Sequence, residues 1–176
     1  MAIEGDISNR LSWRASAEEP DWDAVYSAEL PRVYNYFRYR FANDSLAEDL
    51  TSRTFEKAWA ARRRYRRDLA GFGTWLVRIA RNVAVDHLRA QRLHLPLEAA
   101  GEVAAHGTPE DDHAHASDLA RLASLIEQLP ERERELLALK YGAEATNRAI
   151  ARLTGLSESN VGTILHRAVT ALRHKW

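Results

Sequence analysis

Apolar residues recur every three or four positions along almost the whole chain, which is the spacing of a helix face. No stretch of any length alternates apolar and polar residues as a half-buried strand does. The pattern therefore predicts an all-α fold. The length of 176 residues is enough for one ordinary domain or two small ones.

Three helices are expected in the first half of the chain, over residues 20–41, 45–59 and 74–92. The second begins with Ser45-Leu46-Ala47-Glu48, the pattern of a capping box. In such a box the Ser45 hydroxyl and the Glu48 carboxylate each accept a hydrogen bond from a backbone N–H of the first turn.

The charged residues are distributed unevenly, although the net charge is zero. Residues 20–93 carry +5 and residues 130–176 carry +3, whereas residues 94–129 carry −6. Two basic blocks around an acidic one indicate two modules that face polyanions. The predicted organisation is two small helical domains joined by a flexible linker: an N-terminal tail (1–19), a first domain (20–93), the linker (94–116) and a second domain (117–176).

Residues after the linker continue the helical pattern. Thr108-Pro109 followed by three acidic residues is a helix start, and that helix is expected to reach Gln128. Pro130 then opens a helix expected to end near Tyr141.

Residues 147–174 have the pattern of a helix-turn-helix. A short helix precedes the turn Thr154-Gly155-Leu156, and Ser157 is a natural N-cap for the next helix. In this motif the second helix enters the major groove, and its first polar side chains meet base edges while nearby arginines meet phosphates. The alternative is an ordinary helical hairpin. The residues expected at DNA are Arg148, Arg152, Ser157, Glu158, Ser159, Asn160, Thr163 and Arg167.

A basic run, residues 62–67, lies next to Tyr65, Phe72 and Trp75. Cations that track phosphates beside rings that stack on bases suit single-stranded DNA. Asn82 and Asp86 lie one helical turn apart and are expected to hold an extruded base. The alternatives are that Phe72 and Trp75 are core residues and that the arginines form a solvated face. The residues expected at this strand are Arg63, Arg64, Arg66, Trp75, Arg78, Asn82, Asp86 and Arg89.

The helix at residues 45–59 is expected to expose an acidic and apolar face, which suits docking into a groove of another protein. Its members are Glu48, Asp49, Leu50, Arg53 and Phe55.

Three stretches, in order, resemble motifs of the bacterial sigma-70 family of RNA polymerase sigma factors, in its small extracytoplasmic-function (ECF, group 4) class. Residues 44–59 resemble the core-binding helix of region two. Residues 72–89 resemble the stretch that reads the −10 element, and Leu129-Pro130 through Arg134-Glu135 resembles the opening of region four. The helix-turn-helix then corresponds to the −35 reader. The sequence departs from the family pattern at Arg53, Ala149, Gly162 and Ile164.

The resemblance implies a cytoplasmic promoter-reading subunit that is not an enzyme and is monomeric when free. Its implied partners are core RNA polymerase, promoter DNA and an inhibitory anti-sigma protein, with no small-molecule substrate and no cofactor. The sequence has no cysteine, no catalytic motif and no apolar run of the ~20 residues that span a membrane. His94, His106, His113 and His115 lie among acids, but their irregular spacing favours a polar linker over a metal site.

Two other functions remain open at this point. One is a helix-turn-helix regulator whose N-terminal half is a sensory or dimerising domain, which predicts an apolar dimer seam and a ligand pocket. The other is a module that binds protein partners only.

Overall fold

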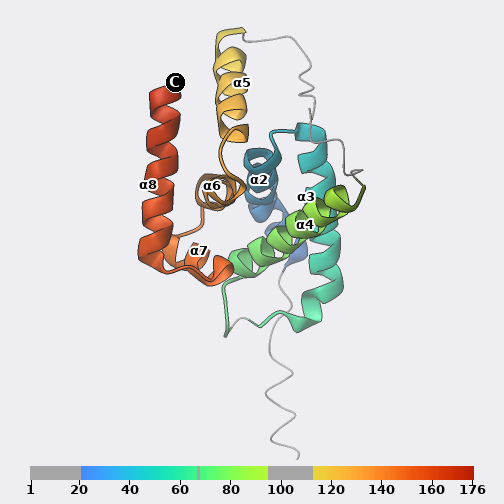
Figure 1. Ribbon diagram of the computed structural model, residues 1–176. Helices are drawn as coiled ribbons and strands as arrows, with labels where there is room; N and C mark the ends of the chain where they lie inside the picture. Colours follow the sequence, from blue (N-terminus) through green and yellow to red (C-terminus); the bar gives the residue numbers. More distant parts are fainter. Residues whose placement is uncertain (1–20, 67, 95–112) are drawn as a thin grey trace, which may run out of the picture.

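The computed structural model describes residues 21–66, 68–94 and 113–176, and every regular element within them is helical (Figure 1). The all-α prediction is therefore confirmed for this part of the chain. The elements, in order, are α2 (Trp22–Phe41), α3 (Asp44–Ala61), the 3-10 turn η1 (Arg62–Arg64), α4 (Phe72–His94), α5 (His113–Glu127), α6 (Glu131–Leu137), the π-helical turn η2 (Ala138–Gly142), α7 (Asn147–Thr154) and α8 (Glu158–Lys175).

Helices α2 and α3 each begin just after a residue whose side chain caps the first turn. Asp21 caps α2 by accepting from the backbone N–H groups of Asp23 and Ala24. The cap of α3 is Asn43, whose side-chain oxygen accepts from Leu46 N at 2.8 Å. The predicted capping box at Ser45 was wrong by two residues, because Asn43 already has the extended backbone of an N-cap.

The N-terminal unit is a bundle of α2, α3 and α4. Phe37, Leu50 and Leu76, one from each helix, are completely buried in its core. The third helix begins at Phe72, two residues earlier than predicted, and ends at His94.

The C-terminal unit consists of α5 to α8, with α6, α7 and α8 folded around Leu136, Ile150 and Val161. The helix expected from Glu131 to Tyr141 is α-helical only as far as Leu137 and then widens into η2. Helix α5 begins at His113, inside the segment predicted as linker; the predicted start at Thr108-Pro109 lies outside the described residues.

The two units pack against each other. Helix α2 contacts α3 and α4 on one side and α5, α6 and η2 on the other, so it lies at the centre of the molecule (Figure 1). Buried residues of both units form one continuous hydrophobic cluster. The sequence predicted two helical units but not this direct contact between them.

Candidate nucleic-acid interface

Helix α4 carries a polar stripe. Arg78, Asn82, Asp86 and Arg89 follow one another at spacings of four, four and three residues, and all four side chains are exposed. Ile79, Leu76 and Ala80 turn the other way, into or toward the core. Asn82 and Asp86 were predicted to share a helix face, and both are exposed on this stripe.

The stripe borders an open groove of ≈ 650 Å³ between α3 and α4, lined by Lys57, Ala61, Ile79, Arg81, Asn82, Val85, Asp86 and Arg89. Lys57 Nζ donates to the Asp86 carboxylate at 3.2 Å and joins the two helices at the exposed edge of this groove. Sequence reasoning missed Lys57, because 29 residues separate it from Asp86 and only the packing of α3 on α4 brings them together.

The aromatic residues beside the basic run form a cluster. The ring of Trp75 lies 5.2 Å from those of Tyr65 and Phe72, and Phe72 in turn meets Trp22 at 5.5 Å. Trp75 and Phe72 are half-buried and pack against the core. The core interpretation of these two rings therefore holds in part, because both side chains pack against the core but keep some accessible surface.

The arginines of the basic run differ in the contacts that their side chains make. The Arg62 guanidinium lies over the Trp59 ring, 4.1 Å from its centre, while Arg63 and Arg64 are exposed. Arg66 is bound by both oxygens of Asp68, at 3.0 and 2.8 Å, which lowers the pKa of that carboxyl. Asp68 therefore occupies two of the five N–H donors of Arg66 and partly neutralises its charge.

The helix-turn-helix is present at the predicted residues. Helix α7 ends at Gly155, whose φ of 75° is a left-handed conformation that glycine adopts without strain. Ser157 caps α8 by accepting from Asn160 N at 3.2 Å. Ile150, Val161 and Leu165 are buried at the corner between the helices.

The side chains predicted to meet DNA all point to solvent. Arg148, Arg152, Ser157, Glu158, Ser159, Asn160, Thr163 and Arg167 are exposed along α7 and the start of α8. Arg148 lies 3.7 Å from Glu158, and the Thr163 hydroxyl donates to the Ser159 carbonyl. Ile164 is half-buried against the core and not presented to a groove.

Comparison with known proteins matches both units, in order. Residues 25–94 match the family model of sigma-70 region 2, and residues 119–172 match that of sigma-70 region 4. The RNA polymerase sigma factor CarQ of Myxococcus xanthus is 30% identical over 86% of this chain and 87% of its own length. This chain belongs to the ECF class of the sigma-70 family.

A second relative, the ECF RNA polymerase sigma factor BldN of Streptomyces coelicolor, is 31% identical over 90% of this chain, and the match spans 62% of BldN. A solved structure of the sigma factor RpoE from Bartonella quintana, in complex with the anti-sigma factor NepR, has the same fold. Its TM-score is 0.74 at 19% identity, over 88% of this chain and 95% of that one.

As an ECF sigma factor, the chain directs RNA polymerase to promoters, with α2–α4 as region 2 and α6–α8 within region 4. Its candidate polymerase-docking helix is α3. Glu48, Asp49 and Arg53 are exposed there, with Arg53 paired to Asp49 at 3.0 Å. Phe55 is half-buried, 4.6 Å from the Tyr26 ring.

Leu50 corrects the sequence prediction for this sigma factor. It was expected on the exposed face of α3, but none of its surface is accessible, because it packs between α2 and α4. It is therefore a core residue and does not belong to the docking face.

Two further findings concern the described residues of the sigma factor. Among its described helices, none combines the length and the apolar character needed to span a bilayer. No group of His, Cys, Asp or Glu side chains gathers there as a metal site, and His94, His106, His113 and His115 lie outside the described side chains.

Proposed function

We propose that this sigma factor reads a promoter with two separate surfaces, the α4 stripe for the melted −10 strand and the start of α8 for the −35 duplex. The observation that carries the proposal is the exposed stripe beside the groove, where amide, carboxylate and guanidinium groups lie within one helix face.

The chemistry of the stripe suits an unpaired base. Asn82 offers both a donor and an acceptor to a Watson–Crick edge. Arg78 and Arg89 flank it and suit the phosphates on either side, and Trp75 supplies a ring for stacking. Because the Lys57 ammonium is bound to Asp86, the Asp86 carboxylate is fixed at the edge of the groove. The exposed Arg63 and Arg64 add positive charge beside the stripe, where further phosphates of the single-stranded DNA can bind.

The chemistry of α8 suits a duplex. Asn160 and Thr163 lie in its first turns, where side chains of a recognition helix reach base edges. An asparagine amide pairs bidentately with adenine. Ser159 and Glu158 lie next to them at the start of α8. Arg148, Arg152 and Arg167 suit contacts with the DNA phosphates, which fix the position of the protein along the duplex.

Core polymerase is expected on the exposed face of α3, at Glu48, Asp49, Arg53 and Phe55. An anti-sigma protein is a further expected partner, because the sigma factor RpoE, which has the same fold, was solved in complex with the anti-sigma factor NepR. The chain acts as a monomeric, non-enzymatic subunit in the cytoplasm, where core polymerase and DNA are found. The two domains proposed for these roles are those expected from the sequence, 20–93 and 117–176, with the second extended to the start of α5 at His113.

Transcription by reconstituted holoenzyme tests the proposal. Asn82→Ala is expected to lower open-complex formation on a duplex promoter, with a smaller defect on a template already melted around −10. Gln91→Ala, an exposed residue of α4 off the stripe, is the matched control and is expected to behave as the parent. A change confined to −35 preference in Asn82→Ala would exclude the assignment of α4.

A further inference from the structure

Helix α8 begins with an exposed carboxylate. Glu158 follows the Ser157 cap directly, and its side chain is 55% exposed. In a helix-turn-helix, the side chains at the start of the second helix reach base edges in the major groove. The positive end of the helix dipole stabilises a negative charge at this place. Glu158 therefore stands where a side chain can select a base.

The Glu158 carboxylate is not held by another side chain. Position 162, one turn along α8, is where a lysine or arginine would pair with it, but the residue there is glycine. Among the residues that the structure describes, the cation beside it is Arg148 of α7, whose Nε lies 3.7 Å from Oε2, too far for a hydrogen bond. Because both side chains are exposed, such a pair contributes little. The carboxylate is available to a group outside the protein.

The neighbouring side chains at the start of α8 present few cations. Along this helix, which the structure describes in full, the first arginine or lysine is Arg167. Ile164 is half-buried against the core, and the Thr163 hydroxyl donates to the Ser159 carbonyl. Arginine and lysine read guanine through O6 and N7, whereas carboxylates and amides read the amines of cytosine and adenine. The start of α8 therefore suits base edges that carry an amine.

Of the two amines, a carboxylate suits that of cytosine. An ionised carboxylate only accepts hydrogen bonds. Cytosine presents its N4 amine in the major groove, while guanine presents two acceptors, which repel a carboxylate. Adenine presents the acceptor N7 beside its N6 amine, so one carboxylate oxygen would face a lone pair. Asn160, whose amide both donates and accepts, suits adenine instead.

We propose that Glu158 selects cytosine at one position of the −35 element, by accepting a hydrogen bond from the N4 amine. The inference rests on the proposed role of α8 as the −35 reader and adds the base that the helix selects. Gly162 contributes by leaving the carboxylate unpaired. A Cβ at Gly162 would lie 3.8 Å from its nearest neighbour, Asn147 Nδ2, so the fold has room for a side chain there.

Reconstituted holoenzyme tests the selection on promoters that carry each of the four base pairs at every −35 position in turn. The parent is expected to favour cytosine over guanine at one position by on the order of tenfold. Glu158→Arg should turn that preference toward guanine, because arginine pairs with O6 and N7, and should leave the other positions unchanged. Glu127→Arg, an exposed residue at the end of α5, is the matched control for added charge and should keep every parental preference.

Gly162→Lys tests whether the carboxylate must be unpaired. A lysine at this position can hold Glu158 across one turn, so the preference for cytosine should fall toward parity. Overall affinity for DNA should rise at the same time, because a positive charge is added. A purely structural role of the glycine would not produce this combination. Gly162→Ala adds no charge in the same open space, and it should keep the parental preference.

Three results would overturn the selection of cytosine by Glu158. They are a parent with no preference for cytosine, a Glu158→Arg holoenzyme with the parental preference at every −35 position, and an undiminished preference in Gly162→Lys. Asn160→Ala distinguishes these failures from failure of the proposed function. If Asn160→Ala relaxes a −35 preference and Glu158→Arg does not, α8 is the reader and Glu158 selects no base. If neither variant alters a −35 preference, the role of α8 itself is wrong.

Discussion

Asp49 and Leu50 are neighbours in the chain but lie on different faces of α3. The Asp49 carboxylate is exposed and lies 3.0 Å from Arg53, one turn along the helix, whereas Leu50 has no accessible surface. A docking face built from the sequence alone included both residues. The packing of α2 and α4 against α3 separates them into a surface residue and a core residue.

This separation predicts different consequences for two alanine variants. Leu50→Ala is expected to lower the free energy of unfolding by about 2–5 kcal/mol, because it leaves a cavity in region 2. Asp49→Ala is expected to change it by less than about 0.5 kcal/mol and to weaken binding to core polymerase. Denaturant unfolding and core competition measure the two effects. Parental core affinity in Asp49→Ala would remove that residue from the docking face.

The cap of α3 gives a second prediction. Asn43→Ala is expected to cost about 1 kcal/mol of stability, because the Leu46 N–H loses its partner. Ser45→Ala is the matched control and should cost less than about 0.5 kcal/mol, since its side chain is exposed and does not cap the helix. Equal losses in thermal unfolding would contradict the assignment of Asn43 as the cap.

His87 predicts a pH dependence of stability. It packs edge-on against Phe41, and burial, assisted by the positive charge of Arg53, lowers its pKa below the ordinary value of 6.5, while Asp49 opposes this. The unfolded chain therefore binds a proton more readily than the folded one, and stability falls as pH drops below about 6.5.

Thermal unfolding of the parent and of His87→Gln, followed from about pH 7.5 to 5, measures this contribution. As the pH falls, the melting temperature of the parent is expected to fall more steeply than that of the variant, because glutamine at position 87 has no proton to gain. Identical slopes would show that burial of His87 does not couple to folding.

The −35 reader gives a fourth prediction. Asn160→Ala is expected to relax base preference within the −35 element, with a loss of discrimination of about 1–3 kcal/mol at the base it pairs with. Preference within the −10 element serves as the internal control and should not change. Transcription by holoenzyme from promoters with single changes in each element distinguishes these outcomes, and a shift at −10 alone would reverse the assignment of the two regions.

Arg152 gives a contrasting prediction. Its side chain is exposed at the end of α7, and a phosphate contact carries no sequence information. Arg152→Ala should weaken holoenzyme binding to all −35 sequences alike and reduce the slope of log affinity against log salt by about 1. A selective loss at one base pair would instead assign this arginine to base readout.

The sequence by itself determined where most of the helices lie and which polar residues share one face of a helix. Helical spacing located α2, α3, α4, α7 and α8 to within a few residues, because the signals are local: apolar period, caps and the glycine at 155. Polar residues at helical spacing, such as Asn82 and Asp86, were placed on one face for the same reason. The family motifs then ordered the two units along the chain.

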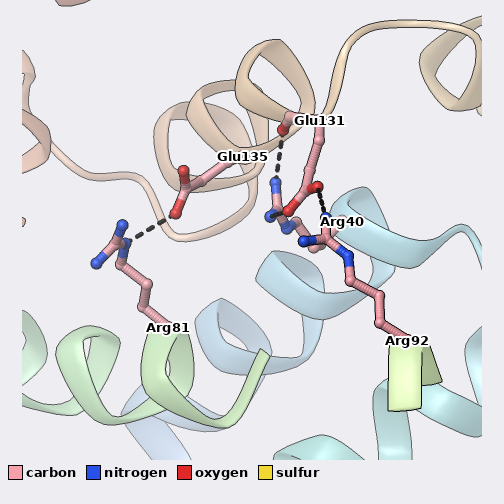
Figure 2. A network of polar contacts seen from close by, with 5 residues as sticks. All are labelled: Arg40, Arg81, Arg92, Glu131 and Glu135. Atoms are coloured by element: carbon pink, nitrogen blue, oxygen red, sulfur yellow. Dashed lines mark hydrogen bonds and ion pairs between the residues drawn. The ribbon is translucent and has the colours of Figure 1, made fainter. Parts of the chain in front are cut away.

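Only the tertiary structure decided the relationships between helices. The burial of Leu50, the pairing of Lys57 with Asp86 and the contact of Gly142 with the α2 backbone all join segments distant in sequence or depend on a neighbouring helix. The spacing of apolar residues indicates which side of its own helix a residue occupies. It does not indicate which other helix packs against that side. The contacts of Arg40 with Glu131 and of Arg81 with Glu135 are the clearest case (Figure 2). Each pair joins side chains from different helices, and neither partner has a local sequence signal that identifies the other.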